Sequence, residues 1–136
     1  MGKIKQFEDL QIWKDAVRIG VLIYKLTSEG ALAKDFSAKD QLRRAVISIS
    51  NNIAEGFEYN STKSFIRFLR FSKGSAGELR SQLYVLKEAG VVKIKDYKVL
   101  YDELMKVSKG IQGFTKYLKE FDTKNNTKTD NNSFRF

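Results

Sequence analysis

The sequence predicts an all-α protein, and three observations lead to that fold class. The 136 residues include no Pro, so long helices meet no residue that breaks them. Apolar residues recur at spacings of three and four over four stretches, which is the helical period. Gly and polar residues separate these stretches. We expect helices at about 8–27, 38–55, 61–89 and 96–121 in one domain, 1–122, and a disordered polar tail at 123–136.

The middle of the chain, from Gln41 to Leu86, reads as a helical hairpin. Two apolar stripes define its arms: Leu42, Val46, Ile49 and Ile53, and then Phe65, Phe68, Ser72, Ala76, Leu79, Leu83 and Leu86. Gly56 suits the left-handed position just past a helix end, and Ser61 or Thr62 suits the next N-cap. The two arms are therefore expected to pack antiparallel.

The first helix carries two apolar stripes on roughly opposite sides. The first contains Leu10, Trp13, Val17, Val21 and Tyr24, and the second contains Ile12, Ala16, Ile19, Ile23 and Leu26. A helix of a small bundle needs only one buried stripe. Either the second stripe packs on the 28–38 connection, in which Gly30 ends the helix and Phe36 turns into the core, or it forms a subunit interface.

Two further segments have an unusual composition for helices. The non-core side of the second helix carries Gln41, Arg44, Ser48, Asn51, Asn52 and Glu55. Ser and Asn compete for the backbone inside helices, so this side either hydrogen-bonds to another helix or subunit or faces water.

Gly74-Ser75-Ala76-Gly77 lies inside the third helix, where each Gly costs about 1 kcal/mol relative to Ala. Close helix approach would explain the two glycines, and a bend is the alternative. Gly90, followed by Val91 and Val92, should end this helix, and Asp96 should cap the next.

Composition limits the chemistry. The chain has neither Cys nor His, which excludes thiolate metal sites and Ser-His or Cys-His nucleophiles. Glu55 and Glu78, with Asn52, are the remaining candidates for a metal-dependent nuclease, but no second motif supports them. We therefore expect no enzyme activity, cofactor or metal. No apolar run approaches about 18 residues, and the start does not resemble a signal peptide, so a cytoplasmic protein is expected.

The formal net charge is +9, and residues 36–90 carry nine Lys or Arg against five acids. A stripe on the third helix contains Arg70, Lys73, Arg80, Tyr84 and Lys87 over about 25 Å of helix. Lys63 and Arg67 extend it, and Arg43 and Arg44 lie on the neighbouring arm. Such spacing suits phosphates of a nucleic acid, with Tyr84 as a stacking face. A merely solubilising face is the alternative. Lys106 and Lys109, on the fourth helix, are expected to lie on a solvated face.

The chain resembles a known family in several motifs. Gln41-Leu42-Arg43-Arg44-Ala45, Ser48-Ile49 and Asn52-Ile53-Ala54-Glu55-Gly56 are similar to the signature of proteins encoded in 23S rRNA intervening sequences. Ser61, Lys63, Phe65 and Gly74-Ser75 with Glu78-Leu79 match its continuation, and Phe7, Asp9-Leu10, Trp13 and Ala16 resemble its opening. The family often has Pro where this chain has Ser50. It includes the accessory protein of diversity-generating retroelements, a basic pentamer that binds nucleic acid and a reverse transcriptase.

The resemblance implies an up-down four-helix bundle that assembles into a ring-like homo-oligomer, most simply a pentamer. The shared motif residues Asn52, Glu55, Gly56, Gly74, Ser75 and Glu78 are then expected to be structural. Two functions follow as hypotheses. The first is binding of RNA or DNA backbone with little sequence preference. The second is a structural or adaptor ring whose partner is a protein such as a polymerase or reverse transcriptase.

Overall fold

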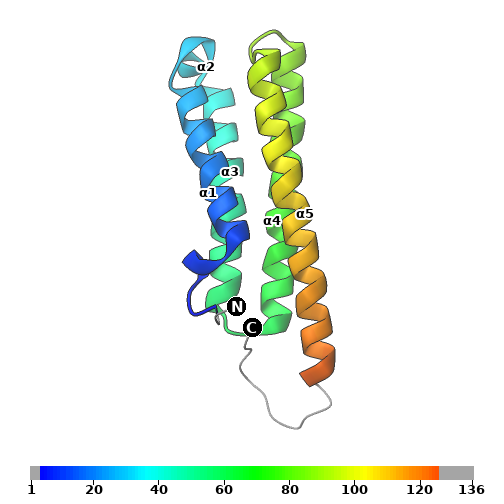
Figure 1. The fold of residues 1–136 in the computed structure, drawn as a ribbon. Helices are drawn as coiled ribbons and strands as arrows, with labels where there is room; N and C mark the ends of the chain where they lie inside the picture. Colours follow the sequence, from blue (N-terminus) through cyan, green and yellow to red (C-terminus); the bar gives the residue numbers. More distant parts are fainter. Residues whose placement is uncertain (1–3, 126–136) are drawn as a thin grey trace.

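The protein is an all-α helical bundle. The computed structural model describes residues 4–125, and within this range it contains helices and no strand. The elements are a 3-10 helix, η1 (Phe7–Asp9), and the α-helices α1 (Gln11–Thr27), α2 (Gly30–Lys34), α3 (Phe36–Glu58), α4 (Thr62–Glu88) and α5 (Ile94–Asn125). The four long helices lie alongside one another, while α2 forms a short cap at one end of the bundle (Figure 1).

The core follows the predicted apolar periodicities closely. Ile19 and Ile23 of α1, Ile49 and Ile53 of α3, and Leu104 of α5 are all fully buried. The inward stripe of α1 is thus the one that contains Ile12, Ala16, Ile19 and Ile23. The most extensive packing joins α3 to α4 and α4 to α5.

Part of the other stripe of α1 remains on the surface, whereas its first residues, Leu10 and Trp13, pack into the core. Val21 is 48% exposed, and Val17 and Tyr24 are also exposed. The 28–38 connection does not cover this stripe, because it folds into α2 and buries Leu32 instead. The expectation that Phe36 turns into the core is wrong: Phe36 is the first residue of α3 and is 77% exposed.

Gly56 does not end a helix as predicted. It is buried inside α3, which continues to Glu58, and the left-handed backbone conformation falls on Asn60, with φ 51°. The role of Gly56 is close packing. An added Cβ would lie 2.7 Å from Cβ of Phe68 and 2.9 Å from Cδ1 of Phe65. A side chain at this position would push α4 away from α3.

Two other predicted helix ends agree with the structure, at Ser61 and Gly90, and the one at Asp96 does not. Ser61 caps α4, because its hydroxyl accepts a hydrogen bond from the amide of Ser64. Gly90 has φ +77°, and the amides of Val91 and Val92 donate to the carbonyl of Leu86. This is the expected Gly stop after a helix. Asp96 is not the cap of α5, which begins one half-turn earlier at Ile94, so Asp96 lies in its first turn.

The remaining predictions about organisation concern the end of the chain and membranes. Residues 123–125 of the predicted tail belong to α5, and the rest of that tail lies outside the described residues. Among the described helices, none combines the length and the apolar character that crossing a membrane requires.

Candidate nucleic-acid interface

A basic groove runs between α4 and α5. Its volume is about 500 Å³, and its lining consists of Arg70, Lys73, Gly74, Gly77 and Arg80 from α4 with Met105, Ser108, Lys109 and Gln112 from α5. We call this set the basic groove. Four of its side chains are cationic, and none of the described residues that line it is acidic. Three of the four cations belong to the stripe predicted from the sequence.

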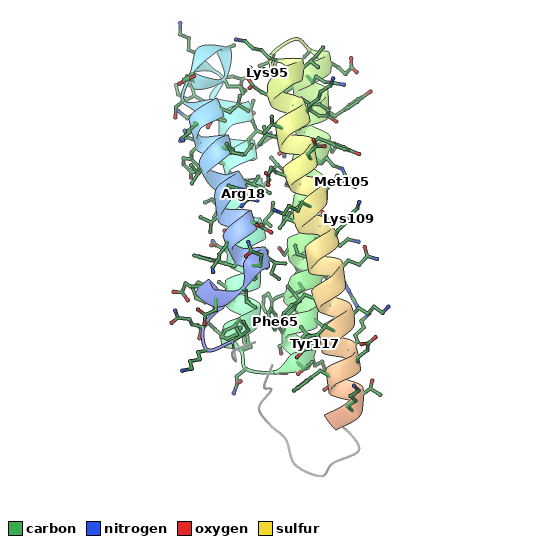
Figure 2. The ribbon with its side chains drawn as sticks, viewed as in Figure 1. Arg18, Phe65, Lys95, Met105, Lys109 and Tyr117 are labelled. Carbon is green, nitrogen blue, oxygen red and sulfur yellow. The ribbon has the colours of Figure 1, made fainter. Side chains whose placement is uncertain are left out.

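The positions along each helix explain why these side chains meet. Arg70, Lys73 and Arg80 lie on the flank of α4 that faces α5, next to the buried stripe that contains Leu69 and Ala76. On α5, Met105 and Lys109 are one helical turn apart (Figure 2). Nη1 of Arg80 lies 3.0 Å from the sulfur of Met105, which holds this guanidinium across the groove.

The two glycines of α4 belong to the groove and not to a helix–helix contact. A Cβ built on Gly74 or Gly77 would meet nothing within 4 Å, so the prediction of close approach to another helix of the same chain is wrong. Their effect is to leave the helix backbone uncovered where Arg70, Lys73 and Lys109 surround it.

The stripe continues beyond the groove at Tyr84 and Lys87. Nζ of Lys87 lies 4.5 Å from the ring centre of Tyr84 and 4.7 Å from that of Tyr97 on α5. An acid partly neutralises the stripe at this residue, because Oε1 of Glu88 is 3.5 Å from Nζ of Lys87. Lys87 therefore serves mainly to fix the rings of Tyr84 and Tyr97, and it adds little unpaired positive charge to the surface.

Lys63 and Arg67 lie toward the start of α4. Lys63 is exposed and precedes Arg70 by seven residues, two turns along the same face. Arg67 is also exposed, and its guanidinium lies 5.5 Å from the ring centre of Phe71. Neither residue lines the basic groove, although Lys63 extends its cationic flank.

Arg43 and Arg44 are not part of this surface. Arg43 stacks over the ring of Tyr24 at 4.2 Å and donates to the hydroxyl of Thr27 at 2.8 Å, so it joins α3 to the end of α1. Arg44 forms an exposed ion pair with Asp40 at 2.8 Å. The prediction that both arginines extend the phosphate-binding face is therefore wrong within a single chain.

The polar side of α3 does hydrogen-bond to a neighbouring helix. The hydroxyls of Ser48 and Ser75 are 2.8 Å apart between α3 and α4. The amide of Asn52 donates to the carbonyl and to the hydroxyl of Ser48, at 2.7 and 2.9 Å. The structural role predicted for Asn52 and Ser75 agrees with this network.

The two glutamates of the shared motif differ from Asn52. Glu55 and Glu78 are exposed, and within residues 4–125 neither carboxylate has a hydrogen bond or ion pair. The intrachain role predicted for Glu55 is therefore wrong, and a role between subunits stays a prediction. The described residues also contain no group of three or more acidic side chains that could hold a metal ion.

A charged cluster between α1 and α5 was not found from the sequence. Asp15 is buried, and its Oδ1 accepts from Gln11 at 2.9 Å and lies 3.2 Å from Nη2 of Arg18. The same guanidinium donates to Glu103 at 2.7 Å, a hydrogen bond that raises the pKa of Arg18. Figure 2 shows Arg18 on α1, about level with Met105 of α5.

Lys106 and Lys109, which the sequence analysis expected on one solvated face of α5, lie on different sides of this helix. Nζ of Lys106 lies 3.9 Å from Asp15 on the α1 side, whereas Lys109 lines the basic groove on the α4 side. The sequence therefore missed Lys109, together with Ser108 and Gln112. Their spacing of three and four residues marks one face of α5, but only the register against α4 shows what that face meets.

A second groove lies between α1 and α3 and has an apolar character. Its volume is about 490 Å³, and its lining includes Val17, Gly20, Val21, Tyr24 and Ile47. We call it the apolar groove. The exposed stripe of α1 forms one wall, and Ile47 of α3 contributes to the other.

The fold and these surfaces define a class of small, basic, all-α helical bundle proteins. Residues 8–113 match the 23S rRNA-intervening sequence protein family, and the chain belongs to it. A solved structure from Bacteroides thetaiotaomicron, described as a protein of unknown function from the S23 ribosomal protein family, has a similar fold. Its TM-score is 0.70 at 22% identity, and the match covers 77% of this chain and 98% of that one. Among curated proteins, none matches this chain.

Proposed function

We propose that the protein is a non-enzymatic binder of RNA or DNA backbone with little sequence preference. The observation that carries this proposal is the basic groove, in which Arg70, Lys73, Arg80 and Lys109 converge. A row of uncompensated cations attracts a polyanion by releasing its counterions. The formal charge of +9 adds a long-range attraction of the same sign.

The groove supplies phosphate ligands and few groups that would read bases. Arg70 and Arg80 offer planar donors that can bind a phosphate through two hydrogen bonds, while Lys73 and Lys109 act as point charges. Phosphate contacts fix the position of a strand but carry no sequence information. Weak sequence preference follows from this set of ligands.

For the fold, we infer an antiparallel up-down arrangement of the four long helices. The pairs of contacting residues support it. Ser48 meets Ser75 and Ile49 meets Ser72, so residue numbers rise along α3 while they fall along α4. The ion pairs of Arg18 with Glu103 and of Asp15 with Lys106 support an antiparallel arrangement of α1 and α5 as well.

We also propose a ring-like homo-oligomer, with a pentamer as the state that the family resemblance implies. The apolar groove supports self-association, because Val17, Val21 and Ile47 remain exposed in the single chain. A ring would repeat the basic groove in every subunit, so that modest contacts add by avidity.

The same apolar groove favours a second candidate function, an adaptor whose partner is a protein such as a polymerase or reverse transcriptase. An apolar contact would respond weakly to salt, whereas phosphate binding weakens steeply as salt rises. Salt dependence therefore separates the two functions.

The test compares two double variants of equal net charge. Arg70→Gln/Lys109→Gln removes two cations of the basic groove, and Lys14→Gln/Lys34→Gln removes two exposed lysines of α1 and α2. We expect the first pair to lower affinity for unrelated RNA and DNA sequences alike. The slope of log K against log salt should become less negative by about 1.4 to 1.8, from two lost phosphate contacts. Equal losses in both pairs would mean that bulk charge drives binding, and no loss in either would favour the adaptor.

A further inference from the structure

A cluster of tyrosines lies at the end of the basic groove near the α4–α5 connection. The rings of Tyr84 and Tyr97 are 6.2 Å apart, and those of Tyr97 and Tyr101 are 5.9 Å apart. Tyr84 is 50% exposed and Tyr101 is 38% exposed, whereas Tyr97 is partly buried against the core. We call these three residues the tyrosine platform.

The platform continues the groove without a break. Tyr84 follows Arg80 by four residues on α4, and Tyr101 precedes Met105 by four on α5, so each lies one turn beyond a lining residue on the same face. From Arg70 to Tyr84 the helix rises by about 21 Å. Cations therefore occupy one part of a single track, and aromatic rings occupy its end.

Lys87 holds the platform in place. Its ammonium lies 4.5 and 4.7 Å from the ring centres of Tyr84 and Tyr97, and such cation–π contacts favour a fixed ring position. The bundle core does not need Tyr84 or Tyr101, because Leu83 and Leu100 beside them fill the buried positions. The rings of Tyr84 and Tyr101 thus remain partly exposed and open to a ligand.

We propose that the basic groove and the tyrosine platform together bind single-stranded nucleic acid in preference to duplex. This inference rests on the proposed function and adds the class of strand. The groove cations contact phosphates, and Tyr84 and Tyr101 stack on unpaired bases. Every base has an aromatic face, so stacking tolerates any sequence. In a duplex the base faces are already stacked within the helix, and the platform gains nothing from them.

The experiment measures binding of oligothymidine, oligouridine and a duplex of equal length by fluorescence anisotropy at one salt concentration. The variant Tyr84→Leu/Tyr101→Leu removes both exposed rings but keeps apolar side chains. We expect a loss of about fivefold or more per ring for both single strands and a change of less than twofold for the duplex. Tyr84→Phe/Tyr101→Phe should bind like the original protein, since stacking needs the ring and not the hydroxyl.

Tyr117→Leu is the matched control. Tyr117 is a comparably exposed tyrosine of α5 that contacts Phe114 and Phe121 and does not line the basic groove. Its loss should leave single-strand affinity unchanged, and melting curves of all variants check the fold. Equal losses for single strand and duplex, or no loss for either, would overturn the preference for single strands while salt-dependent binding itself stands. Absence of salt-dependent binding by the unaltered protein would overturn the proposed function as well.

Discussion

The glycines of α3 and α4 give opposite predictions for the same substitution. At Gly56, an alanine Cβ would lie 2.7 Å from Cβ of Phe68 and 2.9 Å from Cδ1 of Phe65. The Cβ of Phe68 is attached directly to its backbone, so the clash can be relieved only by moving α3 and α4 apart. Overpacking of this kind costs about 1–3 kcal/mol. At Gly74 and Gly77, the new methyl group would meet nothing.

The expected free energies follow from these distances. Replacing Gly by Ala inside a helix gains about 1 kcal/mol from propensity. Gly74→Ala and Gly77→Ala should therefore each raise the free energy of unfolding by about 0.5–1 kcal/mol. Gly56→Ala should lower it by up to about 2 kcal/mol, because the propensity gain offsets only part of the overpacking.

Urea unfolding followed by circular dichroism measures these changes. All variants are compared at one protein concentration, because self-association makes apparent stability depend on concentration. The midpoints should move in opposite directions with unchanged m-values. If Gly56→Ala stabilised the protein as much as Gly74→Ala, close packing at Gly56 would be refuted.

Three further changes test other parts of the structure. Asp15→Ala should destabilise the protein by about 1–3 kcal/mol in thermal melts, because Arg18 and Lys106 lose their buried carboxylate. The control Lys14→Ala changes an exposed neighbour and should be nearly neutral. Equal effects of the two substitutions would contradict the role of Asp15. Gly90→Ala should cost about 1–2 kcal/mol, since its φ of +77° is strained for alanine, and an unchanged melting temperature would count against this. Val21→Asp should shift the mass measured by light scattering toward the monomer, and an unchanged oligomer would remove the apolar groove from the interface.

The sequence predicted the helices well because their periodicity follows from local geometry. The buried stripe of α3 contains the expected residues, and Gly90 ends α4 as predicted. In the stripe of α4, Phe68 and Leu86 are only partly buried, and Leu69, which the prediction left out, is fully buried. The sequence could not assign roles to the glycines. Gly56 looked like a helix stop, and Gly74 looked like a close contact, although the contact is at Gly56. These roles depend on which residues of the next helix lie opposite, and periodicity on one helix carries no such information.

The candidate site shows the same limit. Arg70, Lys73 and Arg80 were found because they share one face of one helix. Lys109 was missed and Arg43 was wrongly included, since both assignments require the packing between helices. Arg43 has its guanidinium on Tyr24 and Thr27, a contact between α1 and α3 that spans 16 residues of sequence.

The salt dependence of nucleic-acid binding by the unaltered protein tests the central proposal most directly. Four groove cations, Arg70, Lys73, Arg80 and Lys109, would contact about four phosphates of a single strand. Titrations of oligothymidine between about 50 and 200 mM salt should then give a slope of log K against log salt of about −2.8 per groove. A slope near zero, or no binding at about 50 mM salt, would contradict a function in binding phosphate backbones.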